Sequence, residues 1–235
     1  MTANKKVKIM YFTDVLCIWA YLAQIRIDEL KTKFGDDVIL QKHFIPVFGS
    51  VNSKMQDNWG DKGGVAAYCE HVQSVAKNFG HIDIHPDVWA KNTPTTSTSC
   101  HLFLKAIQIL CDNGEIPNTV MYEGIEKNTF ELMVWKMRVA FFKDAIDVSG
   151  LSEQMKIAEK VDLPLDKIKN LIENGVAFAG LDDDLQLKEK YGVSGSPTLV
   201  LNEGRQIIYG NVGYRVIEAN IQELLTQPEY QASWC

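Results

Sequence analysis

Cys17 is the residue of this sequence best placed for nucleophilic chemistry. It follows an apolar segment at 7–12 (VKIMYF) and precedes an amphipathic segment that begins at Ile18. The first pattern is typical of a buried strand and the second of a helix, so Cys17 lies at a predicted helix N-terminus. Unpaired N–H groups and the helix dipole favour a thiolate there, and the sequence therefore predicts a lowered Cys17 pKa. A buried, inert thiol at a strand–helix corner is the alternative.

A proline motif at 192–198 (GVSGSPT) is the second chemical feature. Pro197 opens a predicted strand, where proline is tolerated only at an edge or at the first residue. A cis bond between Ser196 and Pro197 would turn the chain and leave backbone groups exposed to an extended peptide. An ordinary trans proline in a turn is the alternative.

The remaining cysteines stand at positions 69, 100, 111 and 235, which makes five in the chain. An odd number without C-x-x-C or a Cys/His zinc spacing is unlike a secreted disulfide framework or a structural metal site, so no metal is expected. Cys69, Cys100 and Cys111 are predicted to be core thiols. Cys235 is either an exposed terminal cysteine or a thiol that resolves a mixed disulfide at Cys17.

The order of predicted elements defines an α/β fold. A strand at 7–12, a helix at 18–34 and a strand at 38–44 form a βαβ unit with parallel strands. Strands at 197–201 and 206–209 and a helix at 216–225 form a ββα unit. Between them the pattern predicts helices at 64–79, 99–111, 132–145, 151–161 and 164–174. The two units must share one mixed sheet, so the predicted domains are 1–48 with 190–235, and a helical insertion at 49–189.

Composition excludes several classes of function. The 235 residues are 46% hydrophobic and 23% charged, which is typical of one or two globular domains. The net charge is −6 and no basic stripe is present, so nucleic acid is not an expected partner. No apolar run approaches the roughly 18 residues of a membrane span, and residues 1–10 lack a signal-peptide pattern. A cytoplasmic protein without a membrane partner is expected.

Cys17 after the first strand, together with Gly-x-x-Gly-Ser-Pro-Thr before a ββα unit, resembles the DsbA-like family of thioredoxin-fold proteins. More narrowly, the chain resembles the cytoplasmic branch of FrnE-like dithiol oxidoreductases, 2-hydroxychromene-2-carboxylate isomerases and kappa-class glutathione transferases. Weaker similarity lies at 98–106 (TSCHLFLKA), 139–148 (VAFFKDAIDV), 177–181 and Asp184. The resemblance implies a thioredoxin-like fold with a helical insertion, catalytic roles for Cys17 and Pro197, and a substrate edge shaped by Ser196.

Three further residues are expected to contact substrate. The resemblance places His101 toward the cleft of glutathione-dependent members, although a lone histidine near a helix start is also a common structural residue. Trp19 lies beside Cys17 and lines an apolar groove or belongs to the core. Arg215, in the 211–215 turn, contacts an anionic ligand or completes a tight structural turn.

Ala20 marks a departure from the redox pattern of the family. The oxidoreductases carry Cys-x-x-Cys, whereas Ala20 leaves Cys17 as a monothiol that needs another thiol to release product. We therefore expect a thiol–disulfide oxidoreductase acting on protein thiols or with glutathione as co-substrate, without a tightly bound cofactor. The alternatives are a glutathione-dependent transferase or isomerase, in which Cys17 replaces the family's serine, and a non-catalytic binding protein. A homodimer is a further expectation.

Overall fold

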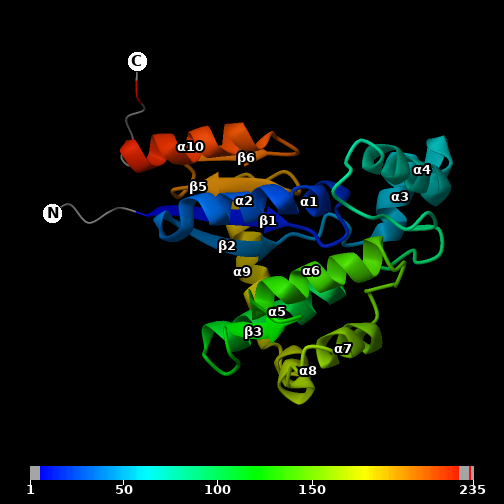
Figure 1. The fold of residues 1–235 in the computed structure, drawn as a ribbon. Coiled ribbons are helices and arrows are strands. Elements are labelled where there is room, and N and C mark those ends of the chain that lie inside the picture. The colour runs from blue at the N-terminus through cyan, green and yellow to red at the C-terminus, as the bar shows by residue number, and fades with distance from the viewer. Residues whose placement is uncertain (1–5, 228–232, 234–235) are drawn as a thin grey trace. The chain divides into compact units, whose positions relative to one another are not determined.

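The computed structural model describes residues 6–227 and Ser233. The chain divides into two compact units, Met1–Ile45 with Asp184–Cys235, and Pro46–Asp183. We call them the sheet unit and the helical unit (Figure 1). The boundaries predicted from the sequence, after residues 48 and 189, lie a few residues further along the chain.

The sheet unit contains a four-stranded mixed sheet in the order β2-β1-β5-β6. β1 (Val7–Thr13) runs parallel to β2 (Val38–Phe44), and both β1 and β6 (Gln206–Tyr209) run antiparallel to β5 (Thr198–Leu201). The parallel pair requires a crossover, which the helices after β1 provide. The βαβ and ββα halves therefore share one sheet, and the predicted thioredoxin-like fold class is confirmed.

The crossover consists of two helices where the sequence predicts one. α1 (Ile18–Leu22) and α2 (Gln24–Phe34) are separated at Ala23, and a short 3₁₀ turn, Gly35–Asp37, follows. Gly35 ends α2 with a φ of 47°, a conformation that costs glycine little because it has no Cβ. The consequence for the site is that Cys17 precedes a helix of only five residues.

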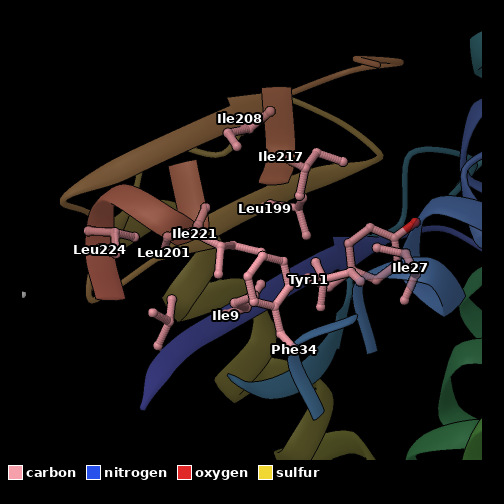
Figure 2. Packing of buried hydrophobic residues seen from close by; sticks show 12 residues of the cluster. Ile9, Tyr11, Ile27, Phe34, Leu199, Leu201, Ile208, Ile217, Ile221 and Leu224 are labelled. Carbon is pink, nitrogen blue, oxygen red and sulfur yellow. The ribbon is translucent and has the colours of Figure 1, made fainter. Parts of the chain in front are cut away.

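One face of the sheet carries the hydrophobic core of the sheet unit. Successive side chains of a strand alternate between faces, so Ile9 and Tyr11 point to the same side as Leu199 on β5. Figure 2 shows these side chains meeting Ile27 of α2 and Ile217 of α10 (Tyr214–Thr226). Burial of each such side chain stabilises the fold by about 1.5–3 kcal/mol, which fixes the strand ends that carry the site.

Asp184 lies in the part of α9 (Val176–Lys190) that belongs to the sheet unit, and its side chain contacts the end of β2. Its Oδ1 lies 2.7 Å from Nδ1 of His43, and its Oδ2 accepts a hydrogen bond from the Phe44 backbone N–H at 2.8 Å. Phe12 stacks on the His43 ring with the centroids 5.1 Å apart. The buried carboxylate therefore satisfies two donors at the end of an edge strand.

The helical unit is built around α5 (Thr98–Asp112), which packs against α6 (Thr129–Phe142), α7 (Leu151–Glu159) and α8 (Leu165–Glu173). α3 (Val51–Trp59) and α4 (Gly64–Ala76) pack against each other. A short hairpin, β3 (Thr119–Tyr122) and β4 (Ile125–Asn128), was not predicted from the sequence. No helix in the described part of the chain is long and apolar enough to cross a membrane.

Candidate functional site

Cys17 caps the N-terminus of α1 with an extended backbone, φ −80° and ψ 115°. Its N–H donates to the Asp14 carbonyl at 3.2 Å, and its own carbonyl accepts from the N–H groups of Ala20 at 3.1 Å and Tyr21 at 3.0 Å. Backbone hydrogen bonds therefore fix Cys17 both to the turn that follows β1 and to the first turn of α1. The Cys17 side chain is only 5% exposed.

The Cys17 side chain is directed to the proline motif. Its Sγ donates to the Ser196 carbonyl oxygen at 3.2 Å, and the Ser196–Pro197 peptide bond is cis. The Ser196 hydroxyl accepts from the Asp14 N–H at 2.9 Å, and the Thr198 hydroxyl donates to the Gly195 carbonyl at 2.6 Å. The tertiary structure thus brings Cys17 next to the Ser196–Pro197 pair, which begins 179 residues later in the sequence.

The pKa of Cys17 is raised above its ordinary value, which corrects the lowered pKa predicted from the sequence. Burial is the main cause, because it removes water from the thiolate. Hydrogen bonds from Ser196 and the Ala20 backbone favour the thiolate but offset burial only in part, and the negative charge of Asp14 opposes it further. The resting thiol is therefore protonated at neutral pH.

Asp14 gives a direct test of this account. The Asp14→Asn variant keeps an oxygen that can accept from the Leu16 N–H, a bond of 2.8 Å in the structure, but removes the charge that raises the Cys17 pKa. The measurement is the rate of Cys17 alkylation by iodoacetamide from pH 6 to 10. In this variant the increase of the rate with pH should begin at a lower pH than in the natural protein. An exposed carboxylate on α2 provides the control, Asp28→Asn. Superimposable pH profiles of Asp14→Asn and the natural protein would contradict the account.

The other predicted substrate residues differ in their exposure to solvent. Trp19 is partly buried on α1, and Arg215 is exposed in the first turn of α10. His101 is 0% exposed within α5 of the helical unit. The substrate contacts predicted for Trp19, His101 and Arg215 stay predictions.

The remaining cysteines differ from Cys17 in their surroundings. Cys100 and Cys111 are buried on α5, as predicted for core thiols, and burial raises the pKa of Cys111 to about 11. Cys69 is partly buried, and burial also raises its pKa. Cys235, the predicted resolving thiol, lies outside the described residues. Within the described ranges, His, Cys, Asp and Glu side chains form no group of three that would hold a metal ion.

A small pocket beside Pro197 was missed in the sequence analysis. It has a volume of about 10 Å³, which is room for about one water molecule, and is lined mainly by apolar side chains, among them Tyr11, Ile27 and Ile208. Arg26 also lines the pocket, and its guanidinium donates to the Asn211 side-chain oxygen at 2.6 Å. The contact between Arg26 and Asn211 could not be predicted from a sequence motif, because the two residues are 185 positions apart.

Comparisons with known proteins show which fold the chain shares. No protein-family model and no curated protein sequence matches the chain. Several solved structures match the chain. A protein from Streptomyces coelicolor described as a probable DsbA oxidoreductase has a TM-score of 0.69 at 13% identity, over 97% of this chain and 94% of its own. The chain has the fold of the DsbA-like proteins.

Two other DsbA-like structures differ in the chemistry that their names describe. The cytosolic disulfide reductase DsbM from Pseudomonas aeruginosa has a TM-score of 0.64 at 16% identity, over 92% of this chain and 98% of its own, and has also been solved with GSH. A 2-hydroxychromene-2-carboxylate isomerase has a TM-score of 0.59 at 15% identity, over 94% and 97% of the two chains. At these identities the DsbA-like fold is shared, and the choice of reaction depends on the residues of the site.

Proposed function

We propose that this protein is a thiol–disulfide oxidoreductase that acts through a single nucleophilic cysteine, Cys17. The observation that carries the proposal is the contact of 3.2 Å between Cys17 Sγ and the Ser196 carbonyl, beside Pro197. A disulfide substrate lying along the Ser196–Pro197 edge would have its sulfur next to the cysteine. The DsbA-like fold, with DsbM among its members, supports the same reading.

The reaction requires two exchanges. In the first, the Cys17 sulfur attacks one sulfur of a substrate disulfide, a mixed disulfide forms, and the second substrate sulfur leaves and takes up the proton lost by Cys17. In the second, another thiol attacks the mixed disulfide, restores the Cys17 thiol and leaves as a disulfide. The net result is that one substrate sulfur is released as a thiol and the other is left in a disulfide with the attacking thiol, so a further thiol must attack that disulfide to complete the two-electron reduction.

The second thiol must come from outside α1, because Ala20 occupies the position that carries the resolving cysteine in Cys-x-x-Cys enzymes. Glutathione suits this role, as does a thiol of a protein partner or Cys235. A cytoplasmic location, where glutathione is abundant, is part of the proposal.

The raised pKa of Cys17 sets the pH dependence of the first exchange. The thiolate is the nucleophile, and burial keeps the thiol protonated at neutral pH. Exchange is therefore expected to accelerate as the pH rises toward and beyond 9, the ordinary value for the group.

A second function is favoured by the same protonated thiol. In a glutathione-dependent transferase or isomerase, Cys17 would donate a hydrogen bond to the sulfur of bound glutathione, as a serine hydroxyl does. This alternative requires glutathione to bind without forming a disulfide to Cys17.

A non-catalytic binding protein is the third candidate function. Such a protein would retain its ligand when Cys17 is replaced.

Peptide mass mapping after incubation with oxidised glutathione tests the proposal, with Cys17→Ser as control. We expect a glutathione adduct on Cys17 that forms faster at pH 9 than at pH 7, is released by reduced glutathione and is absent from the variant. A Cys17 that reacts only after denaturation would overturn the proposal. Saturable binding of reduced glutathione to both proteins without an adduct would then favour the transferase or isomerase.

A further inference from the structure

Thr198 is the first residue of β5, and its side chain is directed back into the proline motif. The residue is only 1% exposed, and its hydroxyl donates to the Gly195 carbonyl at 2.6 Å. This length is typical of a well-formed O–H···O hydrogen bond. The bond joins the start of β5 to the residue before Ser196, so it closes the motif on itself.

Three successive carbonyl groups of the motif each have a different partner. They accept hydrogen bonds at Gly195 from Thr198, at Ser196 from Cys17 Sγ at 3.2 Å, and at Pro197 from the Gly210 N–H at 2.9 Å. The outer two bonds hold the motif on the sheet, whereas the middle bond is made to the nucleophile.

The contact with Cys17 is too weak to position the Ser196 carbonyl by itself, because a thiol is a weak hydrogen-bond donor. Gly195 directly precedes Ser196 and has no side chain that would restrict its backbone, so the peptide that leads to Ser196 needs a fixed partner. The Thr198 hydroxyl provides one, because it holds the Gly195 carbonyl within the motif.

The Ser196 carbonyl acts on the protonation of Cys17. It accepts a hydrogen bond from the thiol, and its partial negative charge lies beside the sulfur, so it stabilises the protonated form. Asp14 is the charged group that acts on Cys17, and the remaining contacts are the Ser196 side chain and the N–H groups of Ala20 and Trp19. The Ser196 hydroxyl is bound separately, by the Asp14 N–H at 2.9 Å. Displacement of the carbonyl alone would therefore favour the thiolate.

We propose that Thr198 is a positioning residue for Cys17: its hydroxyl holds the proline motif so that the Ser196 carbonyl stays against the thiol and keeps it protonated. The inference rests on the proposed function, because it states how the nucleophile of that reaction is held unreactive at neutral pH. It assigns to the hydroxyl a role that the methyl group of Thr198 does not share. Variants that remove the two groups separately therefore distinguish positioning from packing.

The test follows the rate of Cys17 alkylation by iodoacetamide from pH 6 to 10, by mass spectrometry of the peptide that contains Cys17. Thr198→Val and Thr198→Ala lack the hydroxyl, whereas Thr198→Ser retains it and lacks the methyl group. We expect the midpoint of the pH profile to fall in the first two variants, with about a fivefold higher rate at pH 7, which corresponds to about 1 kcal/mol. Thr198→Ser should retain the natural midpoint.

Thr129 provides a matched control in the helical unit. It is 2% exposed and its hydroxyl donates to the Pro117 carbonyl at 2.7 Å, so Thr129→Val removes an equivalent buried bond that the proline motif does not share. Urea unfolding should show a similar loss of stability in Thr129→Val and Thr198→Val, whereas the Cys17 midpoint should stay natural in Thr129→Val. If Thr198→Val does not fold, the smaller Thr198→Ala decides the result.

Four results would overturn the inference: equal midpoints in all variants, a midpoint in Thr198→Ser that falls as far as in Thr198→Ala, the same shift in Thr129→Val, or a rate that rises by one factor at every pH. The last would show that Thr198 only shields the sulfur.

Oxidised glutathione separates this inference from the proposed function, because alkylation does not depend on disulfide exchange. If Cys17 forms no adduct with oxidised glutathione but the midpoint shifts as expected, the proposed function fails and the positioning role of Thr198 stands. If the adduct forms and the midpoint does not move, the proposed function stands and the positioning role fails.

Discussion

The Ala20→Cys variant is expected to form an internal disulfide and to release a thiol bound at Cys17 about a hundredfold faster than the natural protein. Residue 20 lies one turn from Cys17, and its N–H donates to the Cys17 carbonyl at 3.1 Å. A thiol held there attacks the mixed disulfide in an intramolecular step, which has a far higher effective concentration than a dissolved thiol. The substitution would thus convert a monothiol site into a dithiol site.

The measurement is the release of glutathione from glutathionylated protein, followed without added thiol. The natural protein should retain the adduct, and so should Ala20→Ser, which matches the size of the new side chain without its chemistry. Ala20 is 0% exposed, so far-ultraviolet circular dichroism of both variants should accompany the rates. Retention of the adduct by a correctly folded Ala20→Cys protein would show that the two side chains do not meet.

The Asp184→Ala variant is expected to lower the free energy of unfolding by about 3 kcal/mol, because each buried donor left without an acceptor costs roughly 1–3 kcal/mol. Asp184 accepts from the Phe44 N–H at 2.8 Å and lies 2.7 Å from His43 Nδ1. Its side chain is only 3% exposed, so water does not readily replace the lost carboxylate.

Urea unfolding followed by tryptophan fluorescence measures this loss. Asp183→Ala is the matched control, because Asp183 lies next to Asp184 on α9 but is exposed. The free energy of unfolding of Asp184→Asn should lie between the values of the natural protein and Asp184→Ala, since one amide oxygen replaces two carboxylate acceptors. Equal stability of Asp184→Ala and Asp183→Ala would contradict the role assigned to the carboxylate.

Elements with a strong apolar pattern were predicted from the sequence, and elements without one were missed. α3 buries only Val51 and Met55, and all four residues of β4 are exposed, so neither segment has the periodicity on which prediction depends. α9 contains Gly180, which is unfavourable inside a helix. The tertiary structure explains that glycine, because a Cβ there would lie 3.2 Å from the Lys105 side chain.

The break between α1 and α2 was also missed. The apolar spacing continues from Ile18 to Phe34, and Ala23 is a strong helix former, so nothing local marks an end. The consequence is functional, because a shorter helix after Cys17 weakens the dipole that the sequence analysis invoked to lower its pKa.

The sequence by itself determined that Cys17 follows the first strand, that Pro197 opens a later one and that Ala20 leaves Cys17 without a neighbouring thiol. These are local properties, which depend on residue type and spacing over a few positions. Only the tertiary structure decided that the Cys17 thiol meets the Ser196 carbonyl, 179 residues away, and that its pKa rises. Burial is produced by segments distant in the chain, so the protonation state of the nucleophile becomes defined only when the sheet has assembled around it.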